Sequence, residues 1–472
     1  MEFSKQMFAV KSIRQLEIEL ASDNQLRRVL GPWALTALGV GAIIGAGIFV
    51  LTGLAAHDYA GPALVLSFVV AGLGCAFAAL CYAEFAAMIP VAGSAYTYAY
   101  ATMGELLAWI IGWDLILEYG MASSTVAYGW SKYFLHFLEL FGITIPASLT
   151  TDPFNGGLFN LPAAGIVLLV TVVLVIGIRE SASFNATMVV LKLAVVLFVI
   201  AAGIPHVDAK NWDPFMPNGF SGVARGAAYV FFAYIGFDSV STHAEEARRP
   251  QRDVPFALIG SLVVCTVLFM MMMTVVTGLV DYRTLNVANP VAIAIKAAGA
   301  PLRWLMPVVE IGATVGMASV LLVIIMVQSR VLFAMAQDGL LPAPLGRLHE
   351  RWKTPVAGTV LTAAVAAVLG VLVPIGVLGQ MVSIGVLTAF IAVALAVLVW
   401  RRRRPEAPRP FRTPGVPLVP IGAILVCGYM MAGLPTMTWW RFAGWLLLGL
   451  GIYWLYGARS GQRLAARSHA NP

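Results

Sequence analysis

Residues 41–49 read GAIIGAGIF and lie near the middle of an apolar run that covers 33–57. Glycine disfavours a helix by about 1 kcal/mol relative to alanine. Three glycines fall within seven residues here, so the helix is expected to unwind. Within a bilayer, an unwound backbone is tolerated only where protein or a water-filled cavity surrounds it, and its free N–H and C=O groups could bind a zwitterion. Close helix packing through small residues is the alternative interpretation.

Residues 231–239 read FFAYIGFDS, which places one glycine and then an acid inside another apolar run, 221–243. The two interrupted runs are the first and the sixth along the chain. Because they are five apart, and five is odd, the second block of five runs enters the membrane inverted relative to the first. Interrupted helices at corresponding positions of inverted halves indicate a transporter site near the bilayer midplane. The halves share no clear residue-level similarity, so the repeat is inferred from topology.

The composition indicates that lipid is the solvent of most of the surface. Of 472 residues, 60% are hydrophobic and only 11% are charged, whereas a soluble domain carries roughly 25% charged residues. A crossing helix needs about 20 apolar residues. By that criterion twelve spans are predicted, with cores at 33–57, 62–89, 105–134, 160–178, 184–204, 221–243, 255–280, 303–335, 355–374, 380–400, 416–435 and 438–457. The shorter segment Asn289–Gly299 is expected to form a re-entrant or surface helix.

The predicted fold is an all-α membrane protein with 12 transmembrane helices, arranged as a 5+5 inverted repeat plus two C-terminal helices. We expect a cytoplasmic N-terminal segment at 1–30, without a cleavable signal pattern. The first five-helix repeat follows at 31–204 and the second, inverted repeat at 205–402. Two accessory helices at 403–460 and a cytoplasmic tail at 461–472 complete the chain.

The distribution of Lys and Arg predicts the orientation. With both termini in the cytoplasm, most of the 30 basic residues lie inside, a strong positive-inside asymmetry. The exceptions are Lys132, Lys210, Arg283, Lys296, Arg303 and Arg441 on the exterior, and Lys192 and Arg225 within or at the edge of spans. The net charge of +7 therefore reflects topology and not nucleic-acid binding. Arg401–Arg404 is most simply an anchor of this kind, with binding of anionic lipid as the alternative; Glu84 is expected to be structural.

Neither cysteines nor histidines indicate a cofactor. The four cysteines all fall in apolar runs and are interpreted as small hydrophobic residues, and the six histidines show no metal-ligand spacing. No metal or cofactor is expected. The predicted partners are a small-molecule substrate and the lipid bilayer, while a small accessory membrane subunit remains an open question.

The string GAIIGAGIF resembles the first-span motif of the amino acid–polyamine–organocation (APC) superfamily. Four other strings resemble its cationic amino acid transporter branch: CYAEFAAMIPVAGSAYTYAYATMGE at 81–105, GWDLILEYG at 112–120, FFAYIGFDSVSTHAEEARRPQRDVP at 231–255 and DGLLP at 338–342. The resemblance covers residues 30–460. It implies the fold of the leucine transporter and proton-coupled amino acid uptake across a bacterial inner membrane. The chain departs from the family at Val327-Gln328-Ser329-Arg330 and at Gln337, which affects the gate more than the substrate site.

An amino acid presents a carboxylate and an ammonium on one carbon, and broken helices offer complementary groups. The half-helix after the first break begins with free N–H groups and a positive dipole end. The carboxylate is therefore assigned to the backbone of Ile44, Gly45, Ala46 and Gly47. Free carbonyls before each break suit the ammonium and are assigned to Ile43, Phe231, Ala233 and Tyr234, with Ile235 completing the predicted set. Side-chain selection is expected from spans three, six and eight.

Several ionisable residues lie inside predicted spans. A charge at the depth of Lys192 costs at least about 2.5–3.5 kcal/mol. Through the resemblance, this lysine takes the place of a sodium ion near span one and couples transport to protons; a structural lysine bonded to span-one carbonyls is the alternative. Glu118 shares a face with Asp114, and is predicted either to favour cationic side chains in the pocket or to be a structural or vestibule feature. Asp238 is expected to cap the second half-helix.

Transport is the predicted function, and several alternatives stay open. An exchanger or uniporter without proton coupling fits the same residues, as does a cationic rather than a small neutral substrate. A major-facilitator carrier would have a long central loop, whereas about a dozen residues join spans six and seven. A channel would require rings of charged residues or filters of carbonyl groups. The sequence contains no nucleophile-elbow motif that would indicate an enzyme. A receptor that binds without moving its substrate is not excluded by motif.

Overall fold

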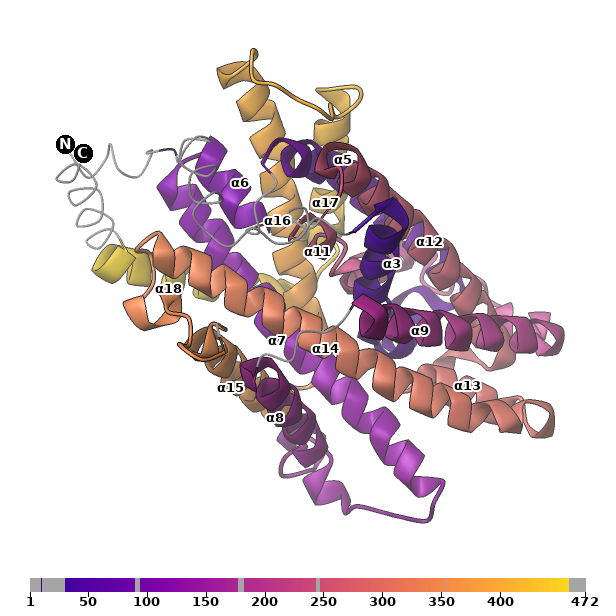
Figure 1. The fold of residues 1–472 in the computed structure, drawn as a ribbon. Coiled ribbons are helices and arrows are strands. Elements are labelled where there is room, and N and C mark those ends of the chain that lie inside the picture. Colours follow the sequence, from indigo (N-terminus) through magenta and orange to yellow (C-terminus); the bar gives the residue numbers. More distant parts are fainter. Residues whose placement is uncertain are drawn as a thin grey trace.

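The chain folds into a bundle of helices (Figure 1). The computed structural model describes residue 10 and residues 30–89, 94–176, 182–242, 247–352 and 354–457. Within these ranges the longer elements are helical, and the recorded β pairing consists of two isolated bridges. The α-helices are α3 (Pro32–Ile43), α4 (Thr52–Ala55), α5 (Leu64–Met88), α6 (Ser94–Thr102), α7 (Glu105–Glu139), α8 (Leu161–Ile176), α9 (Ala182–Gly203), α10 (Gly219–Val230), α11 (Ser239–Thr242), α12 (Pro250–Leu279), α13 (Pro290–Ala297), α14 (Met306–Gln337), α15 (Val356–Leu372), α16 (Ile375–Arg403), α17 (Leu418–Ala432) and α18 (Thr436–Ile452).

The all-helical membrane class is confirmed, while the count of crossings is only partly supported. Each of the twelve predicted cores coincides with helical residues. Among the described residues, length and apolar composition qualify seven helical stretches as spans, or eight if α17 and α18, which meet at 114°, count as one. Three further apolar helices, α3, α8 and α15, are shorter. Twelve crossings and the inverted repeat therefore stay predictions. The predicted segments 1–30 and 461–472 lie almost wholly outside the described residues.

Two long helices, α7 and α14, pack along each other through the middle of the bundle (Figure 1). Around them, α15 and α16 also contact α7, α5 packs on α12, and α3 lies against α12 and α9. The outward faces of α8, α9 and α12 expose large apolar side chains such as Leu168, Val190 and Val263. A surface of this kind suits lipid as its solvent, because it would be costly in water.

Two short helices lie between the longer ones. The expected helix near Asn289–Gly299 is present as α13, whose apolar side chains are buried. Helix α6 was not anticipated, because its sequence SAYTYAYAT is short and rich in polar and aromatic residues. It packs on α7 and α16. Tyr96 of α6 donates a hydrogen bond to the Asp338 carboxylate at 2.7 Å, which ties this segment to the residue after α14.

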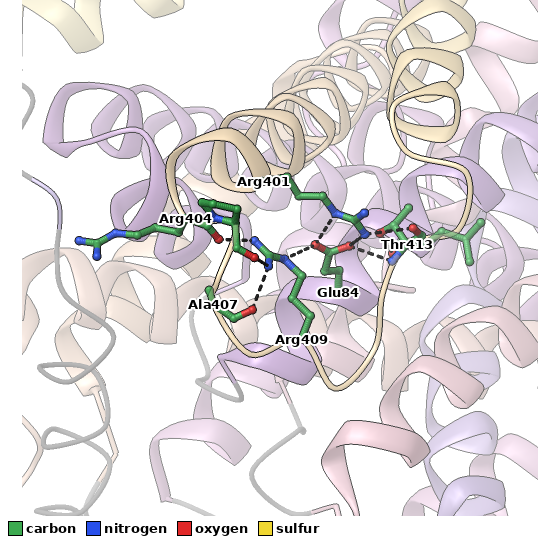
Figure 2. Close-up of polar contacts among 8 residues, drawn as sticks. Glu84, Arg401, Arg404, Ala407, Arg409 and Thr413 are labelled. Atoms are coloured by element: carbon green, nitrogen blue, oxygen red, sulfur yellow. Dashed lines mark hydrogen bonds and ion pairs between the residues drawn. The ribbon is translucent and has the colours of Figure 1, made fainter.

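Glu84 on α5 organises the end of the bundle at which α16 finishes (Figure 2). Its carboxylate accepts two hydrogen bonds from the guanidinium of Arg401, at 3.1 and 2.7 Å, and one from the Thr413 backbone N–H at 2.8 Å. Arg409 forms a further ion pair with it at 3.3 Å. Glu84 is therefore structural, as predicted. Arg401, the first residue of the predicted basic anchor, also has a partner inside the bundle, because the buried Glu84 carboxylate binds its guanidinium.

The last helix, α18, docks on α7 through tryptophans. The indole N–H of Trp113 donates to the Trp445 carbonyl and that of Trp445 to the Trp113 carbonyl, at 2.8 and 3.1 Å, and the two rings stack at 4.5 Å. Trp109 donates to the Gly449 carbonyl one turn further on. Each polar indole group thus finds a partner while the rings bury apolar area, so the accessory helix is fixed to the central helix of the bundle.

Candidate functional site

The first predicted break is present. Helix α3 ends at Ile43, and Ile44 has an extended backbone conformation with ψ 99°. Ala46 returns to helical angles, and a π-helical turn, η1 (Gly47–Leu51), leads into α4. The Gly45 carbonyl accepts hydrogen bonds from the N–H groups of Ile48 and Phe49 at 3.2 and 3.3 Å, which starts the second half-helix. The glycine-rich stretch therefore separates two helical segments, and residues 39–53 around it are buried.

The second predicted break is also present. Helix α10 tightens into a 3₁₀ turn, η8 (Phe231–Tyr234), and Ile235 then adopts an extended conformation with ψ 140°. Gly236 follows with a φ of +97°, a region that side chains rarely adopt. Helix α11 begins at Ser239, so Asp238 occupies the position immediately before it. Its capping of the α11 backbone by the side chain stays a prediction.

The two breaks lie against each other with almost no side chain between them. A Cβ atom built on Gly47 would stand 2.3 Å from the Ala233 Cα. A Cβ on Gly236 would stand 2.9 Å from the carbonyl oxygen of Ala42. Only glycine permits these approaches, so the sequence of both stretches is explained by backbone meeting backbone. On the other side of the first break, Gly45 faces Val320 of α14.

The predicted main-chain donors are not all free. The Ile44 N–H donates to the Val40 carbonyl at 2.9 Å and closes the last turn of α3, so this group cannot also hold a carboxylate. Among the described residues, no acceptor is recorded for the N–H groups of Gly45, Ala46 and Gly47. The Tyr234 carbonyl accepts from the Phe237 N–H at 3.3 Å, which leaves it one lone pair.

Lys192 on α9 reaches the first broken helix. Its Nζ donates to the Gly41 carbonyl at 2.8 Å, and the side chain is 2% exposed. Its methylene chain lies against Gly316 of α14, where a Cβ would stand 3.2 Å from the Lys192 Cγ. The lysine thus joins α9, α3 and α14 next to the break. This contact agrees with both interpretations of the lysine, as a coupling residue and as a structural one.

A group of buried acids on α7 and at the second break comprises Asp114, Glu118 and Asp238. Glu118 and Asp114 occupy one face of α7 and both approach Gly385 of α16. Both Asp114 oxygens and Oε2 of Glu118 are buried without a hydrogen-bond partner among the described residues. Asp238 accepts a hydrogen bond from Tyr119 at 2.6 Å. Sequence reasoning missed Tyr119, because an aromatic residue in an apolar span gives no polar signal.

Comparison with known proteins identifies the family of this chain. A family model described as "Amino acid permease" matches residues 30–452. The chain belongs to the amino acid permease family. This confirms the resemblance to the APC superfamily, and the permease is a multi-pass membrane transporter and not an enzyme.

Relatives of the permease are named for different substrates. It is 48% identical over 458 residues to the branched-chain amino acid permease BcaP of Bacillus subtilis, covering 96% of this chain and 98% of that protein. It is 45% identical over 455 residues to the methylthioribose transporter of the same organism, at 96% and 98% coverage. It is 38% identical over 394 residues to cationic amino acid transporter 4 of Homo sapiens, covering 82% of this permease and 62% of that protein.

Proposed function

We propose that this permease takes up a neutral apolar amino acid in symport with protons, by alternating access, across a bacterial inner membrane with both termini in the cytoplasm. The observation that carries the proposal is the contact of two broken helices beside a buried lysine. Gly47 meets Ala233 at the breaks, and Lys192 is bonded to Gly41, four residues before Gly45. A site with this arrangement can bind a substrate at the break of the first span and respond to a proton on the lysine that is bonded to the same helix.

In this proposal, main-chain groups bind the carboxylate and the ammonium, which every amino acid shares. The N–H groups of Gly45, Ala46 and Gly47 begin the second half-helix, where the positive dipole end attracts a carboxylate. The carbonyls of Ile43, Phe231, Ala233 and Tyr234 lie before the breaks and offer acceptors to the ammonium. Ile44 and Ile235 contribute extended backbone rather than new donors. Because these groups are part of the backbone, the carboxylate and ammonium are recognised without any charged side chain.

Lys192 provides the coupling in this proposal. When protonated, it donates to the Gly41 carbonyl and holds the first half-helix in place. Loss of the proton removes one donor and the charge, which weakens the attachment of α3 to α9. The burial of the lysine makes its charged form costly without such a partner. The position of α3, and with it the break, therefore follows the protonation of Lys192.

The side chain of the substrate is assigned to the apolar residues around the two breaks. Gly45 faces Val320, and Phe231 and Ile235 of the second break are buried and apolar. BcaP is named for branched-chain amino acids, which fits this lining. The competing candidate is a cationic amino acid, and one observation favours it: Glu118 keeps a buried oxygen without a partner among the described residues.

Uptake by reconstituted vesicles tests the proposal. Purified protein in proteoliposomes is given radiolabelled L-leucine, L-alanine or L-arginine, with the interior at pH 8 and the exterior at pH 6 or pH 8. We expect L-leucine to accumulate at the acidic exterior and the accumulation to collapse with a protonophore. Stronger uptake of L-arginine than L-leucine would favour the cationic candidate. If L-leucine accumulates to the same level with and without the protonophore, proton coupling is refuted.

A further inference from the structure

A second buried acid–base pair lies far from the breaks. Nδ1 of His136, near the end of α7, contacts Oε1 of Glu310, near the start of α14. The Glu310 side chain is fully buried and that of His136 is 15% exposed. The second oxygen of Glu310, Oε2, is buried and has no hydrogen-bond partner among the described residues. Among the described residues, His136 is thus the partner that can balance the charge of this carboxylate.

The pair lies at the end of the bundle opposite to Glu84 and Arg401. Arg403 of α16 donates to the Thr102 carbonyl, just before α7 begins at Glu105. His136 lies 31 residues further along the same helix, which corresponds to roughly 46 Å at 1.5 Å per residue. This end of α7 is the one that the distribution of basic residues assigns to the exterior.

The pair is separate from Lys192 but close enough to act on the same helices. Glu310 precedes Gly316, the contact of Lys192 on α14, by six residues, or about 9 Å of helix rise. One turn before His136, the Tyr133 hydroxyl donates to the Phe49 carbonyl at 2.7 Å. Phe49 belongs to η1, directly after the first break. The pair therefore holds together the two helices that contact η1 and Lys192.

We propose that His136 and Glu310 form a second proton-binding site, on the exterior side, whose proton clamps α7 to α14. The role of this site in transport rests on the proposed function. With one proton in the pair, the imidazolium neutralises the buried carboxylate. Loss of that proton leaves the carboxylate as an uncompensated buried charge, which is strongly unfavourable. Alkaline exterior solution therefore loosens the contact between α7 and α14.

The remaining charges around the pair are solvated. The charged neighbours that act on His136 besides Glu310 are Glu139 of α7 and Lys296 of α13, and Glu139 also acts on Glu310. Both are exposed, so solvent and salt screen them. On the buried side, Tyr133 is the titratable group that faces Glu310, and its hydroxyl is bonded to Phe49. Among these groups, only His136 can supply a buried positive charge to Glu310.

The test is a mutant cycle on the full-length protein. Thermal unfolding is measured in detergent from pH 5.5 to pH 9 for the wild type, His136→Gln, Glu310→Gln and the double variant. We expect His136→Gln to lower the unfolding temperature by at least 5 °C, and the double variant to recover at least half of that loss, since it removes the stranded carboxylate. Glu310→Gln is expected to flatten the pH dependence. A double variant less stable than both single variants would reveal ordinary packing and overturn the proposal. If His136→Gln does not fold, the pH profile of Glu310→Gln against wild type decides.

Transport supplies the second readout and separates this inference from the proposed function. In proteoliposomes, the ratio of L-leucine uptake at exterior pH 6 to that at pH 8 is expected to change at least threefold in the double variant, with Lys192 intact. His57→Gln is the matched control, because His57 pairs with Asp58 in an exposed position, and it should keep the wild-type ratio. An unchanged ratio in the double variant refutes the second proton site. If the wild type transports none of the twenty amino acids, the proposed function fails while the unfolding cycle still decides the pair.

Discussion

The carbonyl oxygen of Gly41 accepts a hydrogen bond from Nζ of Lys192 at 2.8 Å, one helical turn before the backbone of the first span unwinds. A charged side chain from α9 thus holds the helix whose broken end is proposed to bind the carboxylate. Because the charged ammonium donates more strongly than the neutral amine, the proposed coupling acts through this contact on the position of the break.

Replacing Lys192 is expected to uncouple transport. In Lys192→Ala, no proton can be taken up at this position, so pH-driven accumulation of L-leucine should be abolished, while exchange of L-leucine across the vesicle membrane persists at a reduced rate. Lys132→Ala is the control: that lysine is also part-buried and donates to a carbonyl, of Thr150, but lies away from the breaks. Proton-dependent accumulation retained by Lys192→Ala would refute the coupling role.

Adding a methyl group at Gly47 is expected to separate the two breaks. In Gly47→Ala, the new Cβ would stand 2.3 Å from the Ala233 Cα, and backbone cannot give way as a side chain can. We expect at least a tenfold loss of affinity for L-leucine, measured by the ligand-induced shift in unfolding temperature. Gly45→Ala should lose less, because it meets the Val320 side chain at 3.0 Å. Gly165→Ala, which meets no atom within 4 Å, is the control; equal affinities for all three variants would contradict the proposed site.

Gly236 tests backbone strain and close contact together. In Gly236→Ala, a side chain is forced into a φ of +97° and towards the Ala42 carbonyl. The strain alone costs roughly 1–2 kcal/mol, and the contact adds to it. Gly219→Ala has a φ of +60° but open space around it, so it reports the strain without the contact. We expect Gly236→Ala to unfold at a clearly lower temperature than Gly219→Ala; equal losses would show that the contact with Ala42 does not matter.

Glu84 is expected to be the main anchor of the segment that follows α16. Glu84→Gln removes the charge that Arg401 and Arg409 share. Removal of one partner of a buried ion pair typically costs about 3 kcal/mol, so the unfolding temperature should fall by several degrees. Arg402→Gln, at an exposed neighbouring position, should change it little. Limited proteolysis between α16 and α17 should accelerate in Glu84→Gln, and an unchanged cleavage rate would argue against the anchor.

The sequence predicted the helical class and both breaks, since glycine content and apolar run length act locally. The family resemblance also placed Lys192 near span one, where its Nζ donates to the Gly41 carbonyl. The sequence did not anticipate that the Ile44 N–H is already used by Val40, because the residue at which α3 ends depends on one final hydrogen bond and not on composition. Nor could it pair His136 with Glu310, or Glu84 with Arg401. Those contacts join helices distant in the chain, and only the packing of the bundle brings them together.

The bond between Glu84 and Arg401 has a mechanical consequence. Glu84 belongs to the first predicted block of five helices and Arg401 to the second. Their ion pair therefore connects α5 of one block to α16 of the other. We expect these two helices, and the loop that leads to α17, to move together at this end of the bundle during a transport cycle. On this expectation, the relative motion of the helices takes place away from the contact between Glu84 and Arg401.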